Sequence, residues 1–345
     1  MKVIYADAAV GCRTIPDESV DCVVTSPPYY GLRDYGVEGQ IGLEKSPRDY
    51  IDRLVNVFRE IRRILKPEGT VWVVIGDSYA GSGKGAAMYP ENAAKYKQGT
   101  NQGMVGAIKT AELPKTLGGI KPKDLIGIPW AFAFAMRDDG WYLRQDIVWA
   151  KPNPMPESVR DRCTRSHEYI FMFSKSRKYY FDGESISEPT AESTNKRLAQ
   201  NIDVQTGSAR VPGKTNGPMK AVAPRYGGNK YTATPDKFFR TKSGHAYDYR
   251  PRRNKRDVWT VTTRGYKGAH FATFPPDLIR PCILAGCPDG GTVLDPFCGS
   301  GTTLQVAKEN GRDGIGIELN REYGELIECR VGKVEAQDEK HTPEG

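Results

Sequence analysis

The segment TVLDPFCGSGTT, residues 292–303, constrains the fold more than any other stretch of the chain. Its apolar and β-branched start is typical of a strand, and the strand ends at an acid, Asp295. A Gly-x-Gly turn follows and begins a helical pattern over 302–310, and glycine there allows a close approach of backbone to a ligand. A second strand over 314–317 ends at another acid, Glu318, 23 residues after the first. This order predicts two parallel strands joined by a helix.

The same alternation continues along most of the chain. Strands are predicted over 2–5, 22–25, 71–75, 142–149 and 169–174, and helices over 48–65, 123–138, 276–285 and 321–331. Alternating strands and helices predict an α/β fold with a parallel sheet between helices. With 345 residues, of which 38% are hydrophobic, the chain has enough apolar side chains for one large domain or two small ones.

Hydropathy and cysteine content exclude several classes of protein. The mean hydropathy is −0.56, the sequence has no apolar run near 18 residues, and Asp7 stands where a signal peptide needs apolar residues. We therefore expect a cytoplasmic protein. Seven cysteines without paired short spacing indicate buried free thiols instead of disulfides or a zinc site, and four widely separated histidines predict no metal.

The basic charge is concentrated in one segment. The net charge is +8, and residues 191–267 alone contain 17 Lys and Arg against 5 Asp and Glu. Aromatic residues alternate with these charges, as in KFFR at 237–240 and YDYRPRR at 247–253. Basic and aromatic side chains together suit contacts to phosphates and bases, so the segment indicates nucleic-acid binding. A solvated, accidentally basic insertion is the alternative.

The glycine-rich turn favours a nucleoside without phosphates. The two acids at strand ends suit ribose hydroxyls and a cationic group. The turn departs from the dinucleotide pattern G-x-G-x-x-G because Thr302-Thr303-Leu304 follows its second glycine, and Asp295 would repel a pyrophosphate. S-adenosylmethionine has a matching chemistry, since its ammonium group can pair with an acid near Asp295 and its ribose with Glu318.

Three motifs together resemble one enzyme family. VLDPFCGSGTT with GIELN, the preceding HFATFPPDLIRPCI, and TSPPYY near the start are similar to the S-adenosylmethionine-dependent DNA amino-methyltransferases. The order of catalytic motif, basic segment and cofactor motif resembles the circularly permuted β group of that family. The resemblance covers nearly the whole chain. It implies a Rossmann-like methyltransferase fold, usually with a seven-stranded mixed sheet, and an inserted target-recognition region.

The resemblance also implies a division of the chain. Residues 1–181 would form the catalytic half, 182–262 the basic target-recognition region, 263–335 the cofactor-binding half and 336–345 a flexible tail. The catalytic half contains a long loop, 78–119, which is either a segment that closes over nucleic acid or a linker. Its GSGKG sequence lacks the Ser or Thr that follows the lysine of a phosphate-binding P-loop.

The motif TSPPYY supplies the catalytic residues that the resemblance implies: Ser26, Pro27, Pro28 and Tyr29. The exocyclic amine of cytosine or adenine is a poor nucleophile, because its lone pair is delocalised into the ring. Hydrogen bonds from the amine to Ser26 Oγ and the Pro27 carbonyl would favour a geometry suited to attack on a methyl sulfonium. Tyr29 would stack on a base flipped out of the duplex. Taken alone, the motif would also fit a surface turn.

Further site residues follow from the same resemblance. Cofactor-binding residues are predicted to be Asp7, Phe271, Thr273, Asp295, Pro296, Phe297, Gly299, Gly301, Thr302 and Glu318. DNA-binding residues are predicted to be Trp149, Lys151, Asn153, Arg250, Arg252, Arg253 and Arg256. Packing alone would explain Trp149 equally well.

Ser26 favours cytosine N4 over adenine N6, because an aspartate at that position commonly accompanies adenine methylation in the family. Adenine N6 is the alternative. Methylation of RNA or of a glutamine side chain, or a nucleic-acid binder without activity, are further hypotheses. The predicted partners are double-stranded DNA and S-adenosylmethionine without membrane or metal, and the resemblance is compatible with a companion restriction endonuclease.

Overall fold

The computed structural model describes residues 1–32, 36–80, 120–121, 123–193, 252–263 and 274–338, and the backbone of 238–240 and 246–248. The chain divides into two units. The larger one comprises Met1–Ser185 and Arg256–Gly345, and the smaller one Ile186–Lys255. Most of the loop predicted over 78–119 lies outside the described residues.

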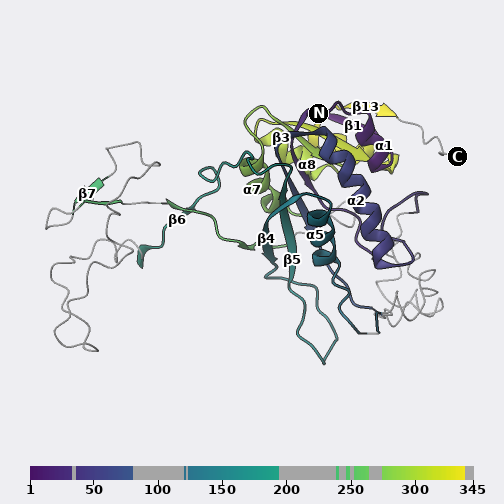
Figure 1. The fold of residues 1–345 in the computed structure, drawn as a ribbon, viewed down its shortest axis with the longest axis horizontal. Coiled ribbons are helices and arrows are strands. Elements are labelled where there is room, and N and C mark those ends of the chain that lie inside the picture. The colour runs from purple at the N-terminus through teal and green to yellow at the C-terminus, as the bar shows by residue number, and fades with distance from the viewer. Residues whose placement is uncertain are drawn as a thin grey trace. The chain divides into compact units, whose positions relative to one another are not determined.

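A nine-stranded sheet forms the centre of the larger unit (Figure 1), in the order β10-β4-β5-β3-β2-β11-β12-β1-β13. Its strands are β1 (Lys2–Tyr5), β2 (Val20–Thr25), β3 (Leu65–Ile75), β4 (Tyr142–Ala150), β5 (His167–Ser174), β10 (Val258–Thr260), β11 (Thr292–Asp295), β12 (Asp313–Glu318) and β13 (Glu335–Asp338). The strands pair in parallel, except that β5 runs antiparallel to both of its neighbours. This mixed sheet confirms the predicted α/β class.

Two short edge strands make this sheet larger than the seven strands that the resemblance implied. β13 pairs in parallel with β1 and includes residues 336–338, the start of the segment expected to be a flexible tail. β10 pairs in parallel with β4 and comes from the end of the predicted target-recognition region. Both strands have three or four residues, too few for a clear alternation of apolar and polar positions, which is why the sequence did not predict them.

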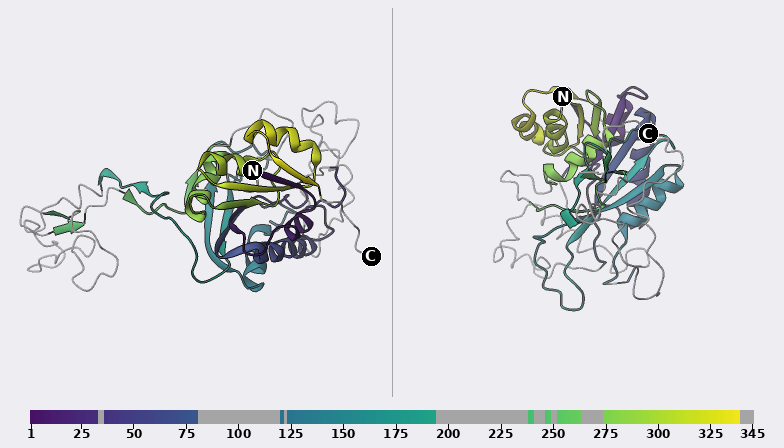
Figure 2. Two further views of the ribbon diagram at one scale, coloured as in Figure 1. Left: turned by 90° about the horizontal axis from the view of Figure 1, so that it is seen from above. Right: turned by 90° about the vertical axis from the view of Figure 1, so that its left-hand side faces the viewer.

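Helices pack in two layers, one on each face of the sheet (Figure 2). The first layer comprises α1 (Ala8–Arg13), α2 (Pro47–Ile64) and α5 (Ile128–Asp138). The second comprises α7 (Pro276–Gly286), α8 (Thr302–Glu309) and α9 (Gly324–Val331), the last preceded by the 3₁₀ turn η6 (Arg321–Tyr323). The sequence predicted η6 and α9 as one helix and did not predict the six-residue α1.

The amphipathic helix α2 shows how the sequence sets its own boundaries. Ser46 caps its start, because the Ser46 hydroxyl accepts a hydrogen bond from the Asp49 backbone N–H at 3.1 Å. The apolar face is buried in the core and includes Leu54, Phe58 and Ile61. The helix ends at Ile64, close to the predicted end, because the proline at position 67 disfavours helical backbone just before it.

Helix α5 begins five residues later than the sequence predicted. Gly127, its N-cap, has φ 82°, a left-handed conformation that ends any helix coming from its N-terminal side. The carboxylate of Asp77, just beyond β3, accepts hydrogen bonds from the backbone N–H groups of Gly127 and Ile128 at 3.0 and 3.1 Å. This long-range cap fixes the start of α5, and a contact between residues 50 positions apart leaves no local signal.

The smaller unit contains two short antiparallel pairs. β6 (Glu188–Pro189) pairs with β9 (Arg252–Arg253), and β7 (Phe238–Arg240) pairs with β8 (Ala246–Asp248). This unit lies inside the range 182–262 predicted for target recognition but is shorter at both ends. The recognition role of the range stays a prediction.

The topology brings chemically active segments to one edge of the sheet. β2 lies between β3 and β11, and the chain continues from β2 to β3 through α2 but from β11 to β12 through α8. Neighbouring parallel strands whose connections leave in opposite directions create a crevice at their carboxyl ends. The segments that follow Thr25 and Asp295 meet there, and antiparallel β5 begins at the same edge.

In the described part of the chain, no helix is long and apolar enough to cross a membrane. Among the same residues, no group of three His, Cys, Asp or Glu side chains is placed to hold a metal ion. Five cysteines are buried as expected. Cys163, in a loop, and Cys329, on α9, are exposed.

Candidate active site

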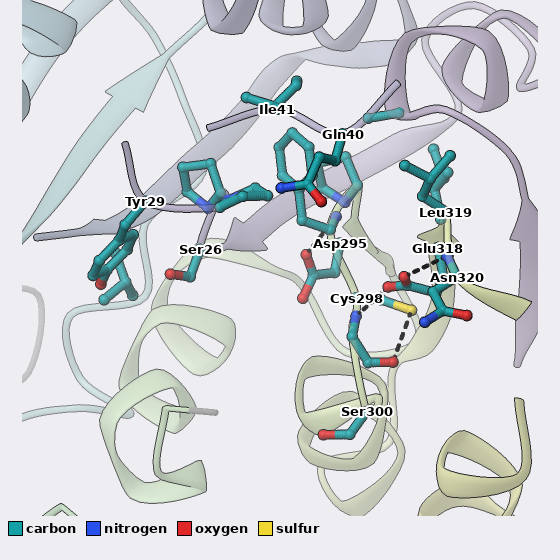
Figure 3. A pocket seen from close by; sticks show the side chains of 18 of the residues that line it. Ser26, Tyr29, Gln40, Ile41, Asp295, Cys298, Ser300, Glu318, Leu319 and Asn320 are labelled. Atoms are coloured by element: carbon teal, nitrogen blue, oxygen red, sulfur yellow. Dashed lines mark hydrogen bonds between the residues drawn. The ribbon is translucent and has the colours of Figure 1, made fainter. Parts of the chain in front are cut away.

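A cavity of about 340 Å³ lies at the edge where the parallel strands end. Its walls come from the segments after β1, β2, β11 and β12 and from the ends of β4 and β5. Figure 3 shows Ser26 and Tyr29 on one side of it, Glu318 and Asn320 on the other, and Asp295 between them. The cavity therefore joins the catalytic motif and the cofactor motif that the sequence predicted.

Asp295 connects the two motifs through buried hydrogen bonds. Thr25, the residue before Ser26, donates its hydroxyl to Asp295 Oδ1 at 2.6 Å, and Thr303 of α8 donates to Oδ2 at 2.6 Å. The backbone N–H of Phe297 also donates to Oδ1, at 3.1 Å. Only 1% of Asp295 is exposed. The carboxylate thus fixes the ends of β2 and β11 and the start of α8 relative to one another.

Glu318 holds the glycine-rich turn from the opposite side. Glu318 Oε2 accepts the backbone N–H of Gly299 at 2.8 Å, and Oε1 accepts that of Asn320 at 2.8 Å. Gly299 and Gly301 have φ of 51° and 80°, a left-handed conformation that favours glycine. Since a carboxylate has about four lone-pair sites, the Glu318 side chain retains acceptor capacity toward a ligand in the cavity.

Burial changes the protonation of both acids. Loss of solvent raises the pKa of Asp295 to about 6 and the pKa of Glu318 to about 7, although their hydrogen bonds act in the opposite direction. A cationic ligand would favour the ionised carboxylates and lower both values again. The acidic end of the cavity is therefore suited to a ligand that carries positive charge and hydroxyl groups.

The catalytic motif lines the opposite end, with Ser26, Pro27, Pro28 and Tyr29 all in the cavity wall. The Tyr50 hydroxyl of α2 donates to the Pro28 carbonyl at 2.9 Å and so fixes the backbone of the motif to the core. Two consecutive prolines restrict the backbone further. The Ser26 side chain is thereby held on a rigid turn at this end of the cavity.

An ion pair lies beside Tyr29. The Tyr29 hydroxyl donates to Glu168 Oε2 at 2.7 Å, and Glu168 Oε1 pairs with the Lys151 ammonium. Only 17% of each charged side chain is exposed. The Lys151 ammonium also lies 4.2 Å from the centre of the Trp149 ring. Lys151 and Trp149 line the cavity as well, so three elements supply this wall.

Asn153 is occupied by a neighbouring loop. Its side-chain oxygen accepts the Thr263 backbone N–H at 3.0 Å, and its side-chain nitrogen donates to the Thr263 carbonyl at 2.9 Å. The Trp149 indole donates to the Val261 carbonyl at 2.8 Å. These bonds anchor residues 261–263 to the end of β4, and Thr263 lines the cavity. DNA contacts by Asn153 and Trp149 stay a prediction.

Most of the other predicted cofactor residues lie around the cavity. Asp7, Pro296, Phe297, Gly299 and Thr302 contribute to its wall. Asp7 also caps α1, because its Oδ1 accepts the Ala9 N–H at 2.9 Å. Gly301 forms the N-cap of α8 and is not among the residues that line the cavity. Phe271 and Thr273 lie outside the described residues, while the nearby Phe274 lines the cavity.

The predicted DNA-binding arginines have neighbours of their own. Arg252 Nε donates to the Ser187 hydroxyl at 2.6 Å, and Arg253 lies 3.4 Å from Glu188 in an ion pair. The Arg256 carbonyl accepts the Trp259 indole N–H at 2.6 Å. Arg250 lies outside the described residues. Their contact with DNA stays a prediction.

Several residues of the cavity wall were not predicted: Gln40, Ile41, Glu168, Ser300, Leu319, Asn320 and Tyr323. Ser300 lies between two predicted glycines, and its hydroxyl is buried without a hydrogen-bond partner among the described residues. A polar residue inside a predicted ligand-binding turn was a usable signal. Glu168 had no such signal, because it is a single acid at the start of an apolar strand.

Comparisons with known proteins identify the class. The parallel sheet, its crevice and the acid pair around a glycine turn define a Rossmann-like fold with a nucleoside-sized site. A family model described as DNA methylase (N6_N4_Mtase) matches residues 20–328. The chain belongs to this DNA methylase family, which confirms the resemblance found in the sequence.

Relatives along the whole chain agree with this assignment. Type II methyltransferase M.SmaI of Serratia marcescens is 43% identical over 330 residues, 96% of this chain and 90% of the relative. Type II methyltransferase M.Cfr9I of Citrobacter freundii is 42% identical over 332 residues, 96% and 87%. The chain is thus a Type II DNA amino-methyltransferase of the N4-cytosine or N6-adenine family.

Solved structures show the same fold. The PvuII DNA methyltransferase (cytosine-N4-specific) superimposes with a TM-score of 0.55 at 16% identity, covering 97% of this chain and 94% of that one. A putative DNA modification methylase from Thermus thermophilus, solved with S-adenosyl-L-methionine, superimposes with a TM-score of 0.55 at 20% identity, covering 99% of both chains. At these identities the likeness concerns the Rossmann-like fold alone.

Proposed function

We propose that the protein transfers a methyl group from S-adenosylmethionine to the N4 amine of cytosine in duplex DNA, after the base has flipped out of the helix. The observation that carries the proposal is the single cavity that places Ser26 at one end and the acids Asp295 and Glu318 at the other. One end suits the amine of a base and the other a cationic nucleoside.

The acidic end fits the cofactor by its chemistry. S-adenosylmethionine supplies a methyl group activated by a positively charged sulfur, and it also carries an ammonium group and ribose hydroxyls. The carboxylates of Asp295 and Glu318 suit the positive charge and the hydroxyls. The buried Ser300 hydroxyl, which lacks a partner in the described part of the chain, offers a further polar contact. A volume of about 340 Å³ lies within the range of small-molecule sites.

The catalytic motif prepares the amine for attack. We assign Ser26 Oγ and the Pro27 carbonyl as acceptors of the two amine hydrogens, which favours a pyramidal nitrogen with an available lone pair. The rigid turn, fixed by the hydrogen bond between Tyr50 and Pro28, keeps these acceptors in place without reorganisation. The Tyr29 ring provides a stacking surface for the flipped base.

The charge beside the motif supports cytosine over adenine. The Watson–Crick edge of cytosine presents two neighbouring acceptors beside the amine, N3 and O2. Adenine presents one acceptor, N1, followed by an apolar C–H. The Lys151 ammonium in the cavity wall is a donor that can meet the second acceptor of cytosine. N6-methylation of adenine is the alternative, and the two reactions share the same acceptors.

The basic segment supports a DNA substrate. Residues 191–267 contain most of the excess positive charge, and we propose the range 182–262 as the target-recognition region. The Type II relatives suggest a companion restriction endonuclease for this enzyme as well. We also propose a cytoplasmic location, which is consistent with a DNA substrate.

The product distinguishes the alternatives. Unmethylated plasmid is incubated with the protein and S-adenosylmethionine and digested to nucleosides, which are identified by mass spectrometry. We expect N4-methylcytosine. N6-methyladenine would overturn the choice of base, and methylation of RNA or protein in place of DNA would overturn the substrate. The variant Ser26→Ala, incubated in parallel, controls for a contaminating methyltransferase.

A further inference from the structure

We propose that Glu168 is a positioning residue that orients both Tyr29 and Lys151 toward the target base, an inference that rests on the function proposed above. No motif of the sequence analysis includes Glu168. The contacts of its two carboxylate oxygens carry the inference, because each oxygen binds a different residue of the wall that would face the base.

The geometry around Tyr29 leaves its ring little freedom. The Tyr29 hydroxyl donates to Glu168 Oε2 at 2.7 Å, while the motif backbone holds the other end of the side chain. Gly76 makes room for the ring, since a Cβ at that position would lie 2.6 Å from Tyr29 Cε2. Burial and the nearby carboxylate raise the pKa of Tyr29 well above its ordinary value, so the hydroxyl keeps its proton and remains a donor.

Lys151 depends on the same carboxylate. An ammonium group with 17% of its side chain exposed needs a charged partner, and Glu168 Oε1 is that partner. The Trp149 ring lies under the ammonium at 4.2 Å and restricts it on a second side. The three N–H bonds of the ammonium can serve Glu168 and still leave a donor for an acceptor on the base.

The position of Glu168 follows from the sheet topology. β5 is antiparallel to its neighbours β3 and β4, so it begins at the edge where they end. Its second residue is therefore adjacent to the segment after β2 and to Lys151 just after β4. A purely structural ion pair would not require both partners to line a ligand cavity together with the catalytic motif.

Two isosteric variants test the inference. Glu168→Gln removes the charge but keeps the shape, and Tyr29→Phe removes only the Tyr29 hydroxyl, which binds Glu168 and also interacts with Ser26. We expect each to lower kcat for methyl transfer to plasmid DNA about ten- to hundredfold, the effect of losing a hydrogen bond to a charged group. The Kd for S-adenosylmethionine should stay near that of the unchanged protein, whereas Glu168→Gln should lower the melting temperature because it leaves the Lys151 ammonium without its charged partner. Glu157→Gln is the matched control, because Glu157 pairs with Arg162 and does not line the cavity.

The double variant separates a positioning role from two independent effects. If Glu168 acts through Tyr29, the variant with both changes should lose little more activity than the worse single variant. A multiplicative loss would overturn the coupling, and unchanged kcat in both single variants would overturn the inference. A fall in cofactor affinity as large as the fall in kcat would mark Glu168 as structural and overturn it too. Failure of the unchanged protein to produce N4-methylcytosine would instead contradict the proposed function.

Discussion

The two ends of the cavity are built in different ways. The acidic end comes from two short stretches, 295–302 and 318–320, and backbone N–H groups bind its acids directly. The end around Ser26 is assembled from side chains that lie on β4 and β5 or directly after β2 and β4, which are far apart in sequence. A local motif thus determines where a cofactor would bind, whereas the surroundings of the base depend on the whole sheet.

The largest expected effect is a loss of kcat on changing Ser26, at one end of the cavity only. Ser26→Ala removes a proposed acceptor of the amine and should lower kcat about 10²- to 10³-fold, the effect of losing one preorganised polar group at a reacting atom. Its affinity for S-adenosylmethionine should not change. Single-turnover methylation and calorimetric titration measure the two quantities.

Asp295→Asn changes the other end of the cavity, where the cofactor would bind. It keeps the size of a side chain that is 1% exposed but removes its charge, so the Kd for the cofactor should rise. Equal changes of cofactor affinity in the two variants would contradict the division of the cavity into two ends.

A smaller effect is expected from the space behind Tyr29. Gly76→Ala would place a Cβ at 2.6 Å from Tyr29 Cε2 and 3.3 Å from Glu168 Cδ. The ring must move, and overpacking of this kind should lower kcat about ten- to hundredfold with the cofactor Kd unchanged. Gly183→Ala serves as the control, since among the described residues its Cβ would contact only Phe181, which is 44% exposed and can move. Full activity of Gly76→Ala would show that the Tyr29 position is not critical.

The pH dependence of cofactor binding should distinguish the acidic end. In the folded protein the pKa of Asp295 is about 6 and that of Glu318 about 7, both above their ordinary values. Protonated acids do not attract a cation, so affinity for S-adenosylmethionine should rise about tenfold as pH increases from 6 to 8. Titrations at several pH values measure this. A pH-independent Kd, or an unchanged profile in Glu318→Gln, would contradict the assignment.

The same pKa values have an effect of opposite sign on stability. Because the folded protein binds these two protons more tightly than the unfolded chain, their contribution to stability is complete below about pH 4. It is lost as pH rises through 6 and 7. The ligand-free protein should therefore lose stability as pH rises from about 4 to about 7, whereas cofactor affinity increases from about pH 6 to 8, and thermal unfolding at each pH measures the loss.

The sequence predicted features encoded in consecutive residues better than contacts between distant segments. The strand and turn that end at Asp295, Glu318 one strand later, and the Ser26 motif were evident because each is encoded in consecutive residues. Glu168 was missed, because only the antiparallel pairing of β5 brings it beside Tyr29. Asp77 as the cap of α5 was missed for the same reason, since its partners are 50 positions away. Long-range pairing determines such contacts, and periodicity and local motifs do not report it.

The smallest expected effect concerns the predicted DNA contacts of the smaller unit and the residue that follows it. Replacing Arg252, Arg253 and Arg256 by Gln should weaken DNA binding a few-fold. The slope of log Kd against log salt concentration should fall by at most about three, roughly one for each lost phosphate contact. Arg253 already pairs with Glu188, which should lower its share of the effect. Binding measured between low and high salt gives the slope.

Arg280→Gln is the control for a general loss of positive charge, because Arg280 lies on α7, outside the predicted recognition region, and pairs with Glu309 on α8. The three replacements should leave kcat at saturating DNA unchanged, since both ends of the cavity remain intact. A salt slope equal to that of the control would remove these arginines from the interface. A fall in kcat with unchanged binding would instead show that these arginines affect the end of the cavity around Ser26. That end would then depend on these arginines as well as on the strands of the sheet.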